Sequence, residues 1–300
     1  MQILLTGATG FIGQHLLPLL HYNGHKVRTL SREPGLADMV WEPDTGRIPA
    51  GALDNVEAVI HLAGEQVAER WTSAKKERIE SSRIKSTQAI VEAILAAPAP
   101  SRPHTLITAS AIGYYGNRGP EVLNESAGPG RGFLSKVCVQ WEAASAGAVR
   151  AGVRCVSLRT GIVLSTTGGA LPRVMRGMTI HAGGRLGNGK QYMSWVTVED
   201  AIQAIYFLLA HGECSGPYNV VAPQATTNEM FMATLAEILH CHRLIPIPAA
   251  LAQLTFGPEM ANEVLLTSTR AVPEKLTAAG FAFKDPSLKP ALEHLVRDRI

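Results

Sequence analysis

Three glycines near the start of the chain have the spacing of a phosphate-binding turn. Gly7, Gly10 and Gly13 follow an apolar run and open a segment with apolar residues at helical spacing. Glycine lets the backbone turn tightly and approach a pyrophosphate, and the following helix N-terminus offers N–H groups to the phosphates. An ordinary strand–helix turn is the alternative. The cofactor contacts that this loop predicts are Gly7, Thr9, Gly10, Phe11, Ile12 and Gly13.

The second strand-like run ends in residues that favour NADP over NAD. NAD-selective domains usually place an acidic side chain here to bind the ribose 2′-hydroxyl. This chain has Ser31 and Arg32 at that place and no acid until Glu33. Arginine can pair with a 2′-phosphate through two hydrogen bonds, and serine can donate another. A solvated surface arginine is the alternative, but the preceding glycine loop favours a cofactor role.

Two further strand ends carry polar or small residues. The stretch VIHLAGE (59–65) ends in Leu62, Ala63, Gly64 and Glu65. We expect these four to approach the adenosine-side ribose and the pyrophosphate, with a plain strand end as the alternative. Ser110 follows the next strand, where an open parallel sheet places its ligand. Tyr114 and Tyr115 come next, and tyrosines in a glycine-containing strand-end loop favour a site over simple packing.

These residues require a parallel sheet to bring the strand ends together. Strand-like runs occur at 2–6, 26–30, 56–62, 104–109 and 153–158, and helical patterns lie at 11–22, 72–96 and 133–151. Short strands alternating with helices predict parallel pairing with right-handed crossovers. We therefore expect an α/β fold, a doubly wound Rossmann sheet with a smaller, mostly C-terminal substrate lobe. The predicted dinucleotide-binding domain is 1–165 plus about 190–222, and the lobe is about 166–189 and 223–300.

Composition excludes several other classes of protein. The 300 residues are 46% hydrophobic and 18% charged, which indicates a globular chain with a sizeable core. The net charge of +3 and the lack of a long basic run predict no nucleic-acid partner. No signal peptide or membrane span is expected, and four scattered cysteines indicate reduced thiols in a cytoplasmic protein. We expect no metal site and no membrane partner; a homodimer is left open.

Several motifs together resemble the short-chain dehydrogenase/reductase superfamily, in its extended NAD(P)-dependent epimerase/dehydratase branch. They are TGATGFIG, HLAGE, ASAIGYYG, LRTGIVL and SWVTVEDAI, in this order. The set is similar to the bacterial YfcH-like group of epimerase family proteins, and the likeness extends to RWTSAKKERIESSRIKSTQ (70–88) and RAVPEKLTAAGFAF (270–283). The resemblance therefore covers nearly the whole chain.

The resemblance implies further site residues and exposes one departure. It places Thr160, Gly161 and Ile162 beside the nicotinamide and gives Arg83 a cofactor contact. Extended members carry Tyr-x-x-x-Lys, in which lysine holds the ribose and lowers the pKa of the tyrosine. The corresponding stretch is GFLSK (132–136), so Lys136 is present but Gly132 stands at the tyrosine position. Ser110, Tyr114 and Tyr115 are the hydroxyls left to move a proton, with Lys136 as a cation that favours phenol ionisation.

Two functions follow from these patterns. The first is an NADP(H)-dependent oxidoreductase or epimerase that acts on a small polar or sugar-like substrate. The second is a non-catalytic NADP(H)-binding redox sensor or regulator, which the missing tyrosine favours. Turnover of NADPH with any carbonyl compound or sugar nucleotide would distinguish the two.

Overall fold

A seven-stranded parallel sheet forms the centre of the computed structural model, which describes residues 1–42, 46–180, 183–241 and 244–297. The strand order is β11-β7-β5-β4-β1-β2-β3, and every neighbouring pair is parallel. The strands are β1 (Gln2–Thr6), β2 (Lys26–Ser31), β3 (Met39–Val40), β4 (Ala58–His61), β5 (Thr105–Ala111), β7 (Arg154–Thr160) and β11 (Gly216–Val220). The order runs outward from β1 in both directions, which is the doubly wound arrangement. The predicted fold class is confirmed.

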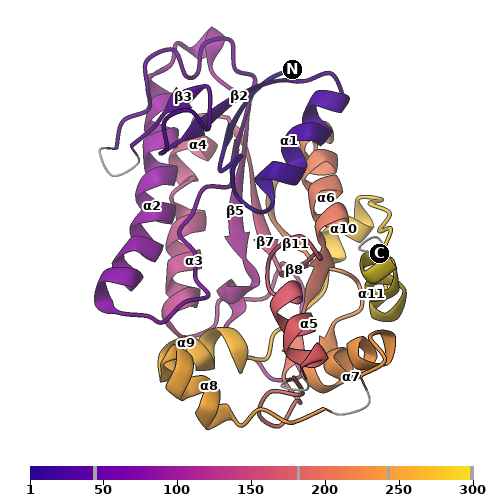
Figure 1. The fold of residues 1–300 in the computed structure, drawn as a ribbon. Coiled ribbons are helices and arrows are strands. Elements are labelled where there is room, and N and C mark those ends of the chain that lie inside the picture. Colours follow the sequence, from indigo (N-terminus) through magenta and orange to yellow (C-terminus); the bar gives the residue numbers. More distant parts are fainter. Residues whose placement is uncertain (43–45, 181–182, 242–243, 298–300) are drawn as a thin grey trace.

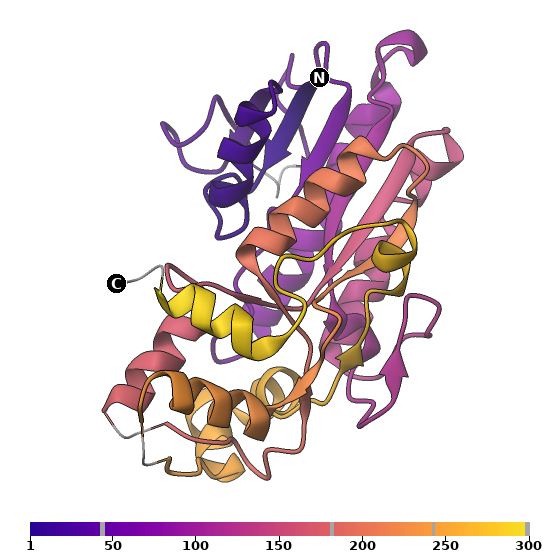
Figure 2. The ribbon, with the colours of Figure 1, turned by 90° about the vertical axis from the view of Figure 1, so that its right-hand side faces the viewer.

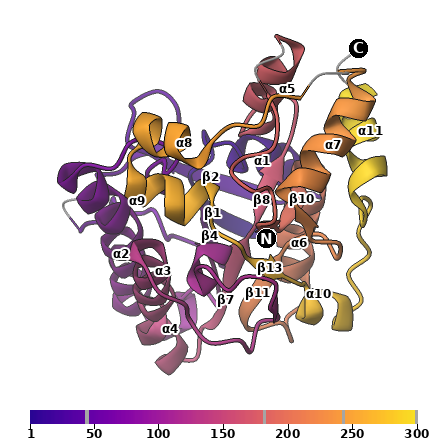
Figure 3. The same ribbon diagram turned by 90° about the horizontal axis from the view of Figure 1, so that it is seen from below.

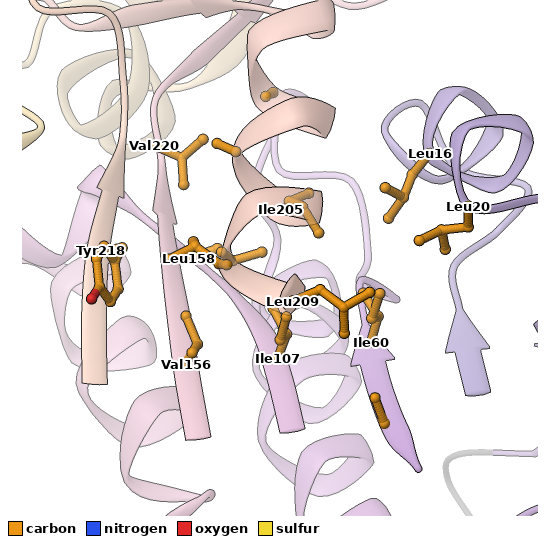
Figure 4. Close-up of a cluster of buried hydrophobic side chains, with 14 of the residues drawn as sticks. Leu16, Leu20, Ile60, Ile107, Val156, Leu158, Ile205, Leu209, Tyr218 and Val220 are labelled. Atoms are coloured by element: carbon orange, nitrogen blue, oxygen red, sulfur yellow. The ribbon is translucent and has the colours of Figure 1, made fainter. Parts of the chain in front are cut away.

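Helices cover both faces of the sheet (Figure 1). One face carries α2 (Ser73–Ala96), α3 (Phe133–Ala143) and α4 (Ala146–Arg150), and the other carries α1 (Gly13–Tyr22) and α6 (Val198–Ala210). Strands buried on both faces need nearly continuous apolar sequence, and all four residues of β4 are buried. Figure 4 shows the layer between the sheet and α1 and α6, where Leu16, Ile60, Ile107, Leu158 and Ile205 pack together.

A second group of elements lies beyond the carboxyl ends of the strands (Figures 1 and 2). It has its own core, in which α5 (Leu171–Thr179), α7 (Asn228–Ile238) and α11 (Leu288–Arg297) surround Trp195. Figure 3 shows α8 (Ala249–Phe256) and α9 (Pro258–Met260) on the other side of this lobe, beside the start of α2. The remaining helical pieces are η2 (Ala99–Ser101), η3 (Ile112–Tyr115), the π-helical turn η4 (Ala261–Leu265) and α10 (Glu274–Ala278).

Three short strand pairs join the lobe to the Rossmann core. They are β10 (Trp195–Thr197) with β8 (Ile162–Leu164), β12 (Thr226–Thr227) with β9 (Tyr192–Met193), and β13 (Arg270–Ala271) with β6 (Val122–Leu123). The last pair brings residues from the C-terminal fifth of the chain against the loop that follows β5. The predicted division into two domains stays a prediction.

Some boundaries differ from those expected. The predicted helix 133–151 is two helices, because the chain bends at Ala144 and Ser145 and brings Gly147 close to Val91 of α2. Strand β5 continues to Ala111, so Ser110 lies inside the strand. None of the described helices has the length and apolar character needed to cross a membrane.

Candidate functional site

A cavity of about 630 Å³ opens where β1, β2 and β4 end. Its lining includes every residue predicted from the glycine loop, from the end of β2 and from the turn after β4, together with one residue at the end of β7. These are Gly7, Thr9, Gly10, Phe11, Ile12, Gly13, Ser31, Arg32, Leu62, Ala63, Gly64, Glu65 and Thr160. The predicted residues Ser110, Tyr114 and Tyr115 are outside this lining. A second hollow, of about 500 Å³ beside the C-terminal half of α2, contains none of the predicted site residues.

The glycine loop is tight because two of its glycines stand against backbone. Gly7 has φ +74°, and a Cβ there would lie 2.8 Å from the Ala63 nitrogen. A Cβ at Gly13 would lie 2.1 Å from the Gly7 carbonyl oxygen. Gly10 has more room, with that oxygen 3.1 Å from its ideal Cβ. Gly7 and Gly13 therefore determine the conformation of the loop. Gly10 lines the cavity, and because it has no side chain a pyrophosphate can approach the backbone there.

At the end of β2, the exposed Arg32 borders the cavity beside Ser31. The Ser31 carbonyl oxygen accepts a 2.8 Å hydrogen bond from the Trp41 nitrogen, which places the buried Trp41 side chain in the cavity wall. Sequence reasoning missed Trp41, because its place in the wall depends on the pairing of β3 with β2.

His61, at the end of β4, lies behind this cavity in a fully buried chain of hydrogen bonds. Its Nδ1 is 2.6 Å from the Thr6 hydroxyl, and its Nε2 is 2.9 Å from the hydroxyl of Ser86, which lines the cavity. Burial, assisted by the nearby Arg83 cation, lowers the pKa of His61 to about 3. The imidazole is therefore neutral at physiological pH and joins β1, β4 and α2.

Arg83 supports the cavity wall from behind. Its guanidinium donates to the carbonyl oxygens of Glu65, at 2.9 Å, and Ile79, at 3.1 Å. The guanidinium carbon stands 3.4 Å from the position of a Cβ on Gly64. Arg83 is outside the cavity lining, so in this structure it positions the 62–65 turn.

The ends of β5 and β7 hold a buried charged network beside Ala109 and Thr160, which line the cavity. The Ser110 hydroxyl donates a 2.8 Å hydrogen bond to Glu142 of α3. Glu142 also accepts two 2.8 Å hydrogen bonds from the Arg159 guanidinium, whose side chain is only 4% exposed. A charge this well buried needs such a partner, and the pairing draws the Ser110 hydroxyl toward α3.

The two tyrosines of the following turn have different environments. Tyr115 is fully buried, with its hydroxyl 2.7 Å from Asn219 Oδ1 and 3.0 Å from the Arg159 guanidinium that donates to it. Burial raises the pKa of Tyr115 above its usual value, although these hydrogen bonds oppose the shift. Tyr114 is half-buried, and its ring lies 3.5 Å from the Arg159 guanidinium carbon.

Helix α3 does not direct Lys136 toward the site. Lys136 is exposed, and the side chains of α3 that face the turn after β5 are Leu134, Ser135 and Cys138. The Cβ of Leu134 and the Sγ of Cys138 lie 3.4 and 3.8 Å from the position of a Cβ on Gly113. Because residues four apart share a helix face, the face that a Tyr-x-x-x-Lys pair would need carries Leu134 and Cys138. Burial raises the pKa of Cys138 to about 12, so its thiol is protonated.

The predicted tyrosine position, Gly132, is filled by a carboxylate from the C-terminal lobe. Glu263, on the π-helical turn, accepts hydrogen bonds from the Phe133 and Leu134 nitrogens at 2.8 and 2.9 Å. Gly132 has φ +108°, and a Cβ there would lie 2.8 Å from this carboxylate. A helix start whose own residues provide no side-chain cap is thus capped by a distant residue.

Of the three residues predicted at and after the end of β7, one lies at the cavity. Thr160 lines it, but Gly161 and Ile162 do not. Their nitrogens donate to Val220 and Ser194 carbonyls at 3.1 and 2.9 Å, because the chain here crosses from the sheet to the β8–β10 pair. Among the described residues, no group of three or more His, Cys, Asp and Glu could hold a metal ion.

Fold and cavity together define a dinucleotide-binding α/β protein of the doubly wound type. Residues 3–221 match the model of the NAD dependent epimerase/dehydratase family, and residues 247–295 match a domain of unknown function (DUF1731). The chain belongs to the NAD dependent epimerase/dehydratase family, which confirms the resemblance seen in its motifs.

Named relatives span almost the full chain. An epimerase family protein of Mycobacterium bovis is 38% identical over 97% of this chain and 96% of its own length. The epimerase family protein YfhF of Bacillus subtilis is 35% identical over 100% of this chain and 99% of its own. The crystal structure of human epimerase family protein SDR39U1 with NADPH superposes with a TM-score of 0.88 at 29% identity, covering 99% and 100% of the two chains.

Proposed function

We propose that this protein is an NADP(H)-dependent oxidoreductase or epimerase of the extended short-chain dehydrogenase/reductase type, acting on a small polar or sugar-like substrate. The observation that carries the proposal is the single cavity that joins the glycine loop, Ser31–Arg32 and the turn after β4. The NADPH in the human relative's structure supports the same cofactor. When bound, the nicotinamide supplies hydride transfer.

The cavity residues fit such a cofactor by charge and by shape. Gly10 leaves room for a pyrophosphate, Arg32 and Ser31 can donate to a 2′-phosphate, and Thr160 lies at the β7 end of the cavity. The proposed division of labour gives residues 1–165 and about 190–222 to the cofactor, and about 166–189 and 223–300 to the substrate.

Proton handling falls to Ser110 or Tyr114. The Ser110 hydroxyl already donates a hydrogen bond to Glu142, so a substrate hydroxyl can pass its proton to Ser110 as Glu142 accepts the serine proton. Tyr114 is the less buried tyrosine of the pair. In this proposal Tyr115 and Lys136 have no catalytic role. The Tyr115 hydroxyl is enclosed in the core, and the Lys136 side chain faces solvent.

Titration of the wild-type protein with NADPH and NADH tests the cofactor assignment. We expect saturable binding of both with tighter binding of NADPH, followed by carbonyl- or sugar-nucleotide-dependent loss of NADPH absorbance. Equal affinity for the two cofactors would refute the NADP assignment.

A non-catalytic NADP(H) sensor is the second candidate function. The observation in its favour is the apolar face of α3, where Leu134 and Cys138 stand toward β5. Tight NADPH binding without turnover across the substrate screen would favour this function.

A further inference from the structure

Two carboxylates line the proposed cofactor cavity close to Arg32. Glu65 and Glu69 both belong to the cavity wall, as do Ser31 and Arg32. An NADP 2′-phosphate adds about two negative charges to this region, and like charges in one cavity repel each other. We therefore expect the cavity to accept a 2′-phosphate more readily when the protein offsets the negative charge of these carboxylates.

One buried lysine pairs with both of them. Lys75 lies in the first turn of α2, and its side chain is only 4% exposed. Its ammonium is 2.7 Å from Glu65 Oε1 and 2.6 Å from Glu69 Oε2. The exposed Arg78 is a more distant partner, 3.6 Å from the same Glu65 oxygen. Lys75 is outside the cavity lining, so its ammonium stands behind the carboxylates.

The ionisation of the cluster agrees with this arrangement. Burial alone would lower the pKa of Lys75, but hydrogen bonds to Glu65 and Glu69 raise it above its usual value. The hydrogen bond from Lys75 lowers the pKa of Glu65 against the effect of burial, and the Arg78 and Arg32 cations act in the same direction. Lys75 and Glu65 are therefore charged at neutral pH, and Arg32 is close enough to Glu65 to interact with it.

We propose that Lys75 is a specificity-determining residue for the cofactor. It pairs with Glu65 and Glu69 and offsets part of their negative charge, so that more of the positive charge of Arg32 is available to a 2′-phosphate. The inference rests on the proposed NADP(H) function. It assigns cofactor selectivity to a residue that does not contact the cofactor and acts through two carboxylates that line its site.

The test is the ratio of NADPH to NADH affinity, because the two cofactors differ only in the 2′-phosphate. Replacement of Lys75 by Met leaves Glu69 without this cation and Glu65 with only the more distant Arg78, and we expect the preference for NADPH to fall about tenfold at low salt. The loss should shrink as the ionic strength rises. Fluorescence titration with each cofactor at two salt concentrations measures both effects, and Glu65→Gln with Lys75→Met should restore most of the preference.

A matched control and a milder variant keep the test decisive. Lys76→Met removes the same charge from the neighbouring residue, which pairs with Glu259 outside the cavity, and should leave the ratio unchanged. Glu69 is 54% exposed, so Glu69→Gln should fold normally and raise the preference for NADPH about threefold. Glu80→Gln is the control for Glu69→Gln, because it removes the charge of an exposed glutamate on α2 that does not line the cavity.

The outcomes separate this inference from the proposed function. Equal weakening of both cofactors in Lys75→Met, or an unchanged ratio in Lys75→Met and Glu69→Gln, would refute the inference alone. A wild-type protein that does not prefer NADPH would refute both the inference and the NADP assignment.

Discussion

The cofactor end and the β5–β7 end of the site are formed by different kinds of groups. At the cofactor end, backbone turns and small residues shape an open cavity, and Arg32 at its border is exposed. At the β5–β7 end, Glu142 and Arg159 form a buried ion pair that also holds Ser110 and Tyr115. Substitutions of residues on the cavity surface at the first end, such as Arg32, should change ligand affinity with little effect on folding. At the second end most substitutions should reduce stability. Only substitutions of the less buried hydroxyls can lower turnover without lowering stability.

Substitutions of Tyr114 and Tyr115 should show the difference between turnover and stability most clearly, because the two residues are neighbours with different environments. Tyr114→Phe should lower kcat by about 10²–10⁴ if this phenol is the acid–base group, with NADPH affinity preserved. Tyr115→Phe should instead lower the free energy of unfolding by about 1–3 kcal/mol, because Asn219 and Arg159 lose a buried partner. Turnover with a screened substrate and urea denaturation measure the two effects. Wild-type turnover by both variants would leave proton transfer to Ser110 and Glu142.

Arg159→Met should cost about 3–5 kcal/mol of unfolding free energy, since it leaves the Glu142 carboxylate buried without its cation. Arg118→Met is the matched control, because its pair with Glu121 is exposed and should contribute at most about 1 kcal/mol. Urea denaturation of both variants measures the difference. Equal losses would show that the β5–β7 network does not depend on this buried pair.

Gly10→Val should reduce NADPH affinity at least about a hundredfold, because a branched side chain enters the space left for a pyrophosphate. The fold should survive, since Gly10 lies in a loop at the end of the sheet, and the 3.1 Å approach of a Cβ to the Gly7 carbonyl oxygen asks only for a local shift of that loop. Gly212→Ala, with open space around its ideal Cβ, is the control. Calorimetric titration of folded protein checks the prediction, and unchanged binding would contradict the assignment of the loop.

Arg32→Ala should weaken NADPH binding by about 30- to 150-fold and change NADH binding little, because only the 2′-phosphate uses the guanidinium. Parallel titrations with the two cofactors measure this. An equal loss for both would mean that Arg32 supports the cavity without reading the phosphate.

We expect the buried His61, behind the cofactor cavity, to make the stability of the protein depend on pH. Its pKa of about 3 lies below the ordinary value of 6.5, so the unfolded state binds more protons between these values. Stability should therefore fall as the pH falls, by about 2 kcal/mol from this residue between pH 7 and pH 5. His61→Gln should remove that part of the slope, with exposed His21→Gln as the control. An unchanged slope in His61→Gln would show that the imidazole is not the group responsible.

The sequence by itself determined the fold class and most of the loops that line the cavity. Alternating strand and helix patterns specify a parallel sheet, and Gly7 and Arg32 line the cavity because each directly follows a strand of that sheet. Such residues are set by local chain geometry, so their neighbours in sequence predict their surroundings. Even so, Asp200 in the first turn of α6 accepts hydrogen bonds from the Lys284 and Asp285 nitrogens, which lie far away in the chain, while Thr197 caps the helix.

Only the tertiary structure decided which side chains meet across elements. Lys136 matched a motif by spacing, but the rotation of α3 against β5 turns it to solvent and faces Leu134 and Cys138 inward. Arg83 lies behind the turn after β4, and Lys75 reaches back to two carboxylates of that turn and the following loop. Glu263 caps a helix that starts 130 residues earlier in the chain. These contacts depend on how helices rotate and pack, and long-range packing leaves no local pattern in the sequence.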